Sequence, residues 1–314
     1  MSSVFSSEQL KAEAFSLGFS ACGIAVARPV DEAMATAYRQ WIAQGGHADM
    51  HYLENNIDKR LDPTLLLPGA RSIIVVALNY APSRRLSKGE YQIADYALGQ
   101  DYHDVMKKRL RQLLPGGFVC VDTVPFLERY WAVQAGLGFI GRNRQLIIPH
   151  AGSRFFLGEI VTTATFNHYD VPLTFHEGHH PCGNCQRCID ACPTGALTPH
   201  PSPFTPHPSP FASKLCLSYQ TIENRGPIDA ALRPKLSPYI YGCDRCQQAC
   251  PLNQSSKPTD IAELQPSDTL LNMTRAKWHT LTLDDYRQLF RGSAVKRAKY
   301  EGLMRNIQAV SREL

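Results

Sequence analysis

HHPCGNCQRCIDACPTGAL, residues 179–197, places four cysteines within eleven residues and a proline directly after the last of them. Cys182, Cys185, Cys188 and Cys192 have the spacing C-x2-C-x2-C-x3-C-P. In proteins that hold two cubane clusters, the first three thiolates of this motif ligate one cluster and the fourth ligates the other. The motif therefore predicts a second cysteine set elsewhere in the chain.

That second set lies downstream, in YGCDRCQQACP (241–251). Its cysteines repeat the C-x2-C-x3-C-P half, and Cys216 supplies the missing thiolate. Tetrahedral zinc sites use similar spacings, but two interleaved sets that both end in Cys-Pro favour iron–sulfur clusters. With the fourth cysteines exchanged, we expect two 4Fe-4S clusters, one on Cys182, Cys185, Cys188 and Cys250, the other on Cys192, Cys216, Cys243 and Cys246. The remaining two cysteines, Cys22 and Cys120, are expected to be small buried apolar side chains.

Length and composition indicate an ordinary globular protein. The 314 residues are 44% hydrophobic, enough for two domains or one elaborated domain. The N-terminus MSSVFSSEQLKAEAF lacks a basic start followed by an apolar run, and no long apolar stretch follows. We expect a cytoplasmic protein without a membrane partner, and, because no oligomerisation motif is present, a monomer.

The order of the expected elements predicts an α+β fold. RSIIVVALNY (71–80) is typical of a buried central strand and FVCVD (118–122) of a second one. A helix is expected from a cap at Ser7 and another over 125–138, while 144–149 and 154–166 are expected to form a hairpin. We predict an N-terminal α/β domain (1–172), a ferredoxin-like double 4Fe-4S module (173–256) and a short basic helical C-terminal segment (257–314).

The positive charge is concentrated at the C-terminal end. The chain carries a net charge of +5, and from Arg275 onward nine Lys and Arg face four Asp and Glu, so this segment alone accounts for it. A basic segment suits a polyanionic partner, although a solvated helix face has the same composition. The tandem PHPSPF repeat in 199–211 predicts an extended surface loop, and without a rigid frame we do not expect His200 and His207 to bind metal.

Two clusters need a terminal electron acceptor, and no G-x-G-x-x-G motif announces a nicotinamide or flavin site. DYHDVM (101–106) contains part of the cobalamin motif D-x-H-x-x-G, but Met106 stands in place of the glycine. We therefore interpret His103 as a structural residue.

Several sequence segments, occurring in this order along the chain, resemble one family, the epoxyqueuosine reductases of queuosine biosynthesis. They are KRLDPTLLLPGARSIIVVALNY, LGQDYHDVMKKRL, VDTVPFLERYWAVQAGLGFIGRN, CGNCQRCIDACPTGAL, CLSYQTIE and YGCDRCQQACPLN. The resemblance runs from about Ala12 to Asn253 and continues in 292–307. It implies bound cobalamin beside two 4Fe-4S clusters, and reduction of epoxyqueuosine at the wobble position of a tRNA to queuosine with loss of water.

The resemblance also implies roles for individual residues. Asp122 matches the catalytic acid beside the cobalt, and we expect desolvation to raise its pKa and keep it protonated. Arg129 matches a residue that faces the tRNA. The residues matching corrin-lining segments are Arg60, Leu146, Leu157, Ser218 and Asp244. Longer members carry a further helical-repeat domain after the position where this chain stops, so we expect phosphate contacts from Lys296, Arg297, Lys299 and Arg305. The electron donor is not identified by the sequence.

Three other classes of protein fit parts of the pattern. A reductive dehalogenase shares cobalamin and two clusters, but usually carries a twin-arginine signal that is not visible here. A ferredoxin-type electron carrier needs no domain of this size before its clusters. A nucleic-acid-binding iron–sulfur protein explains the basic segment but leaves VDTVPFLER without a role.

Overall fold

The computed structural model describes residues 4–175, 180–197 and 211–311. The proline-rich repeat with His200 and His207 lies outside these residues, apart from Phe211. The strands are β1 (Val4–Phe5), β2 (Ala21–Val26), β3 (Ser72–Asn79), β4 (Gln92–Ile93), β5 (Phe118–Cys120), β6 (Phe139–Ile140), β7 (Leu146–Ile147), β8 (Phe155–Thr162), β9 (Thr165–Phe166) and β10 (Tyr239–Tyr241). The helices are α1 (Ser7–Ser16), α2 (Glu32–Ala43), α3 (Ile57–Leu61), α4 (Tyr102–Leu113), α5 (Glu128–Gln134), α6 (Arg187–Asp190), α7 (Leu217–Ile222), α8 (Arg233–Leu236), α9 (Arg245–Gln248), α10 (Asp268–Leu271), α11 (Arg275–His279), α12 (Leu283–Leu289) and α13 (Lys299–Ser311).

A four-stranded antiparallel sheet of order β2-β3-β8-β5 forms the centre of the N-terminal half. The expectation of a buried central strand over 71–80 is confirmed, because β3 lies inside the sheet and its residues 72–78 are buried. Successive side chains of a strand point to opposite faces. Ile74, Val76 and Leu78 accordingly belong to one core cluster, while Ile73 and Val75 belong to another.

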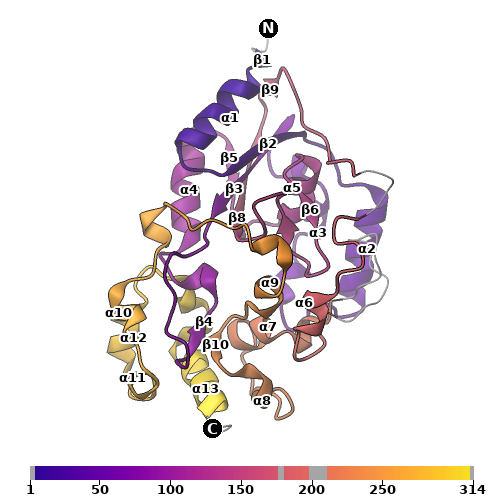
Figure 1. Ribbon diagram of the computed structural model, residues 1–314. Helices are drawn as coiled ribbons and strands as arrows, with labels where there is room; N and C mark the ends of the chain where they lie inside the picture. The colour runs from indigo at the N-terminus through magenta and orange to yellow at the C-terminus, as the bar shows by residue number, and fades with distance from the viewer. Residues whose placement is uncertain (1–3, 176–179, 198–210, 312–314) are drawn as a thin grey trace.

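Helices cover both faces of this sheet (Figure 1). The cluster on one face contains residues of α1 and α4, and the cluster on the other face contains residues of α2, α3 and α5. On the first face, a Cβ at Gly158 of β8 would lie 2.6 Å from Met106 Cε of α4. The absence of a side chain at Gly158 therefore lets α4 pack directly on the sheet. Cys120 is fully buried against the other face and Cys22 is half-buried, so both are packing residues.

Three local expectations differ from the structure. The hairpin expected over 144–166 is wrong, because β7 pairs with β6 while β8 pairs with β3 and β5. The helix expected from Ser7 is present, but Ser6 is its cap and accepts the Gln9 amide. The second strand is also present, at the edge of the sheet next to β8. The strand pairings depend on the tertiary fold, whereas the cap differs by one residue within the same segment.

The C-terminal half is mostly helical and lies below the sheet in Figure 1. A short parallel pairing of β4 with β10 ties residues 92–93 to it. One core cluster joins buried residues from 86–98, 217–241 and 270–310, so the C-terminal helices pack on the segment that carries the second cysteine set. The three-domain division stays a prediction. Among the described residues, no helix is long and apolar enough to cross a membrane.

Candidate active site

The eight motif cysteines lie in two adjoining groups. Two short helices, α6 with Cys188 and α9 with Cys246, pack against each other. The residues before them, Gln186 (φ −120°, ψ 8°) and Asp244 (φ −106°, ψ 7°), have nearly the same backbone conformation, as expected for a repeated motif.

The charges that act on each thiol show which cysteines are neighbours. Burial, together with the charges of Cys182, Cys250 and Cys185, raises the pKa of Cys188 to about 11. Burial, together with the charges of Cys243 and Cys192, raises the pKa of Cys216 to about 11. The structure thus places Cys250 with the first set and Cys192 with the second, which is the interleaved arrangement. Ligation itself stays a prediction.

The sulfur atoms lie too far apart for a tetrahedral zinc site. A tetrahedral zinc site with Zn–S distances of about 2.3 Å holds its sulfurs about 3.8 Å apart. All eight cysteines are among the described residues, yet no three of their sulfurs lie within 4.8 Å of one another. The sulfurs are therefore too far apart for a single tetrahedral ion.

The second cysteine set borders a cavity of about 450 Å³, here called the inner cavity. Its wall includes Cys192, Cys216, Cys243 and Cys246. It also includes four of the residues expected to contact the corrin, namely Leu146, Leu157, Ser218 and Asp244. Asn143 lines the same cavity, and its buried Nδ2 has no hydrogen-bond partner among the described residues. A ligand with hydrogen-bond acceptors at its rim would satisfy this atom.

A larger cavity of about 1110 Å³, the outer cavity, adjoins the inner one. Asp122, Arg129, Tyr102 and Glu128 line both. Arg60, expected at the corrin, lines the outer cavity and donates from Nη1 to Phe126 O at 3.4 Å.

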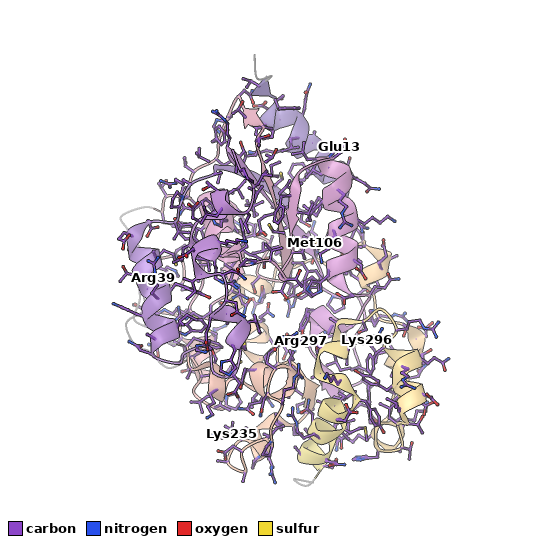
Figure 2. The ribbon with its side chains drawn as sticks, turned by 180° about the vertical axis from the view of Figure 1, so that it is seen from behind. Glu13, Arg39, Met106, Lys235, Lys296 and Arg297 are labelled. Atoms are coloured by element: carbon purple, nitrogen blue, oxygen red, sulfur yellow. The ribbon has the colours of Figure 1, made fainter. Side chains whose placement is uncertain are left out.

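Lys296 and Arg297 lie on the wall of the outer cavity. Figure 2 shows both near the middle of the molecule, where the C-terminal segment meets the upper half. Arg297 is held by two hydrogen bonds to Glu223, at 2.9 and 2.8 Å. Lys296 is exposed and has no ion-pair partner among the described residues.

The other two basic residues are placed differently. Lys299 is exposed at the start of α13 and is not part of the cavity wall that the structure describes. Arg305 points inward, because its guanidinium donates to three backbone carbonyls, those of Gln220, Asn224 and Gly226. These bonds explain Arg305 as a residue that fixes the end of α7, and its phosphate contact stays a prediction.

Asp122 sits directly after β5 in the left-handed region, with φ +51°. Its side chain is 61% exposed because it faces the cavities. Tyr102 Oη donates to Asp122 Oδ2 at 2.7 Å, and His103 Nε2 lies 3.4 Å from the same oxygen. His103 Nδ1 is 2.6 Å from Asp101 Oδ1. The start of α4 therefore surrounds the Asp122 carboxyl with proton-bearing groups.

These neighbours reverse the protonation expected for Asp122. Desolvation by the surrounding protein alone would raise the pKa of Asp122, but the nearby His103, the hydrogen bond from Tyr102 and the charge of Arg129 bring it below its usual value. Burial lowers the pKa of His103, but Asp101 and Asp122 outweigh this effect and raise it to about 9. At neutral pH His103 is therefore protonated and Asp122 is ionised. The expectation of a protonated Asp122 is wrong because it considered desolvation without the partners.

His103, interpreted from the sequence as structural, lines the outer cavity and lies 3.4 Å from Asp122. Sequence reasoning missed Tyr102, His103 and Glu128 as site residues. A usable signal was the Asp101 cap, which accepts the His103 amide at 3.1 Å and so fixes the first turn of α4. The side chain of Met106, by contrast, is fully buried beneath the sheet, and Figure 2 shows it on α4.

A double-cluster module that opens onto adjoining cavities with paired acidic and basic groups defines an iron–sulfur oxidoreductase. Residues 60–116 match the family described as epoxyqueuosine reductase QueG, DUF1730, and residues 181–253 match a 4Fe-4S double cluster binding domain. An epoxyqueuosine reductase of Cellulophaga algicola is 40% identical over 310 residues, covering 96% of both chains. One of Synechocystis sp. is 41% identical over 293 residues, covering 89% of this chain and 95% of the relative. The chain belongs to the epoxyqueuosine reductase family.

Solved structures agree with this assignment. An epoxyqueuosine reductase with an epoxyqueuosine-modified tRNA-Tyr stem loop superposes with a TM-score of 0.84 at 28% identity, covering 98% of this chain and 80% of the other. A Bacillus subtilis epoxyqueuosine reductase, whose catalytic aspartate loop is swung out of the active site, has a TM-score of 0.81 at 26% identity and covers 98% of this chain and 81% of the other.

Proposed function

We propose that this protein reduces epoxyqueuosine in a tRNA to queuosine, with Asp122 delivering a proton to the epoxide oxygen. The observation that carries the proposal is the position of Asp122, which lines both cavities. The inner cavity connects it to the second cysteine set, and the outer cavity connects it to Lys296 and Arg297. Asp122 thus lies where the cavity beside the second cysteine set adjoins the cavity that Lys296 and Arg297 border.

The wall of the inner cavity has the chemistry to contact one side of a cobalamin. Leu146 and Leu157 offer apolar surface for a corrin face, and Ser218 with the unpartnered Asn143 Nδ2 offers polar contacts for its amide side chains. When bound, cobalamin supplies a low-valent cobalt centre that passes two electrons to the substrate. The adjoining cysteine set would hold the cluster that delivers these electrons one at a time.

The protein's own residues handle the protons. Converting the epoxide to an alkene and water consumes two electrons and two protons. Asp122 is ionised at neutral pH, and a protonated His103 lies 3.4 Å from it. We infer that Asp122 takes a proton from His103 and passes it to the departing oxygen, and that the second proton follows the same route after His103 has taken up a proton from solvent. The catalytic aspartate loop of the Bacillus subtilis relative supports an aspartate in this role.

The proposal is tested by single-turnover conversion. Protein loaded with clusters and cobalamin is reduced chemically, mixed with an epoxyqueuosine-bearing stem-loop RNA, and the nucleosides are analysed by mass spectrometry. Formation of queuosine supports the proposal. Unchanged epoxyqueuosine after full reduction, with RNA bound, contradicts it.

The conversion rate is expected to fall at alkaline pH. Because His103 has a pKa of about 9 in the folded protein, it loses its proton as the pH rises through that value. Above it the rate should fall by roughly tenfold per pH unit, as for one essential proton. The measurement is single-turnover conversion from pH 7 to 10, with cluster absorbance and RNA affinity followed in parallel. A rate that stays flat to pH 10 would remove His103 from the proton supply.

Lys296→Ala is expected to weaken RNA binding through lost phosphate contact. Removing one such contact should flatten the slope of log affinity against log salt by about 0.7 to 0.9, while turnover at saturating RNA stays near normal. Lys235→Ala is the matched control, because Lys235 is exposed on α8, lines neither cavity, and lies well below Lys296 in Figure 2. Equal salt slopes for both variants and the wild type would assign Lys296 to the solvated surface.

A further inference from the structure

The loop between β5 and α5, residues 121–127, holds its aspartate in an unusual conformation. Asp122 is one of few residues other than glycine with a positive φ, here +51°. Such a conformation is unfavourable for a residue with a Cβ and persists where surrounding contacts enforce it. Two hydrogen bonds are available, from the Tyr102 hydroxyl to the Asp122 side chain and from the Asp122 backbone N–H to Glu128.

The second contact comes from a fixed point of the fold. Glu128 is the first residue of α5, and its Oε1 accepts the backbone N–H of Asp122 at 2.5 Å. Behind it, Trp131 and Ala132 of the same helix are fully buried against the sheet. Glu128 therefore joins a loop facing the cavities to a helix that is anchored in the core.

Placing a carboxyl group at position 128 opposes folding. Burial, together with the charge of Asp122, raises the pKa of Glu128 to about 7. Glu159 of β8 is a further acidic neighbour; it is fully buried, and neither of its carboxyl oxygens has a hydrogen-bond partner among the described residues. Burying carboxyl groups beside one another opposes folding. An apolar residue at 128 would pack at lower cost but could not accept the Asp122 amide.

We propose that Glu128 is a positioning residue, whose carboxyl oxygen holds the Asp122 amide and so keeps the Asp122 side chain between the two cavities. The inference rests on the proposed function, because it concerns the residue that delivers the proton there. It assigns Glu128 no contact with substrate. The competing role, a proton carrier behind Asp122, predicts different behaviour for a glutamine at this position.

The test compares two substitutions in the cluster- and cobalamin-loaded protein. Glu128→Gln keeps an oxygen at the same reach, so it should accept the Asp122 amide and retain most of the conversion rate. Glu128→Ala removes the acceptor, so hydrogen exchange of the 121–127 backbone should accelerate by about tenfold or more. Single-turnover conversion by the Ala variant should fall by roughly 10- to 100-fold, with RNA affinity unchanged. Glu13→Ala is the control, because Glu13 is exposed on α1, lines neither cavity, and lies far above Lys296 and Arg297 in Figure 2.

Two results would overturn the inference. Exchange of 121–127 in Glu128→Ala as slow as in the wild type would show that the contact does not hold the loop. A Gln variant as slow in conversion as the Ala variant, with the loop still protected, would make Glu128 a proton carrier. If the Ala variant fails to fold, Glu128→Asp replaces it, because its carboxyl is one methylene too short. Hydrogen exchange needs no turnover, so this test stands even if the proposed reaction fails.

Discussion

Replacing Asp122 by asparagine is expected to lower single-turnover conversion of epoxyqueuosine in RNA by roughly 10²- to 10⁴-fold, the usual contribution of a positioned general acid. Asparagine keeps the shape and accepts the Tyr102 hydroxyl that Asp122 accepts at 2.7 Å. It cannot receive a proton from His103 and pass it on. The measurement uses chemically reduced protein, so that electron supply is not limiting.

Three further measurements distinguish loss of the proton donor at Asp122 from loss of the protein's structure or cofactors. Iron content, the spectrum of bound cobalamin and the affinity for RNA should all match the wild type. Asp284→Asn is the control, since that side chain is 88% exposed on α12. Near-normal conversion by Asp122→Asn would exclude Asp122 from catalysis, and loss of cobalamin would make it a binding residue instead.

Asp122 and its neighbours also show which features of the site can be predicted from the sequence alone. The resemblance implied Asp122 from its motif alone, because VDTVPFLER is contiguous in the chain. His103 lies in another segment, and only the packing of α4 on the sheet brings its Nε2 within 3.4 Å of Asp122. The pKa of Asp122 depends on that meeting, so reasoning from desolvation alone gave the wrong direction.

The same distinction between local and long-range features explains the fold. The β3 strand was predictable, since a continuous apolar run identifies a buried strand whatever its partners are. The pairing of β7 with β6 was not, because both strands are two residues long and their partner is chosen by tertiary packing. Arg305 is similar, since its basic charge is visible in the sequence but its three carbonyl partners are not.

Cys250→Ala is expected to remove one whole cluster, and the cluster lost should be the one held mainly by the first motif. The structure places Cys250 beside Cys182 and Cys188, although it follows Cys246 in the chain. Iron and acid-labile sulfide should fall from about eight to about four each per chain. Conversion should fall sharply if the remaining cluster can no longer be supplied with electrons. Cys22→Ala, which changes a half-buried cysteine outside both sets, should keep the full content.

Double substitutions decide which cluster Cys250 serves. If Cys250 and Cys188 ligate the same cluster, the Cys188→Ala, Cys250→Ala protein should lose no more iron than either single variant, because one cluster is lost once. If Cys243 belongs to the other cluster, adding Cys243→Ala to Cys250→Ala should remove nearly all of the iron. The opposite pattern, additive loss with Cys188 and none with Cys243, would mean that the fourth cysteines are not exchanged. Because both pairs are compared within one protein, general destabilisation would affect them alike and could not imitate either pattern.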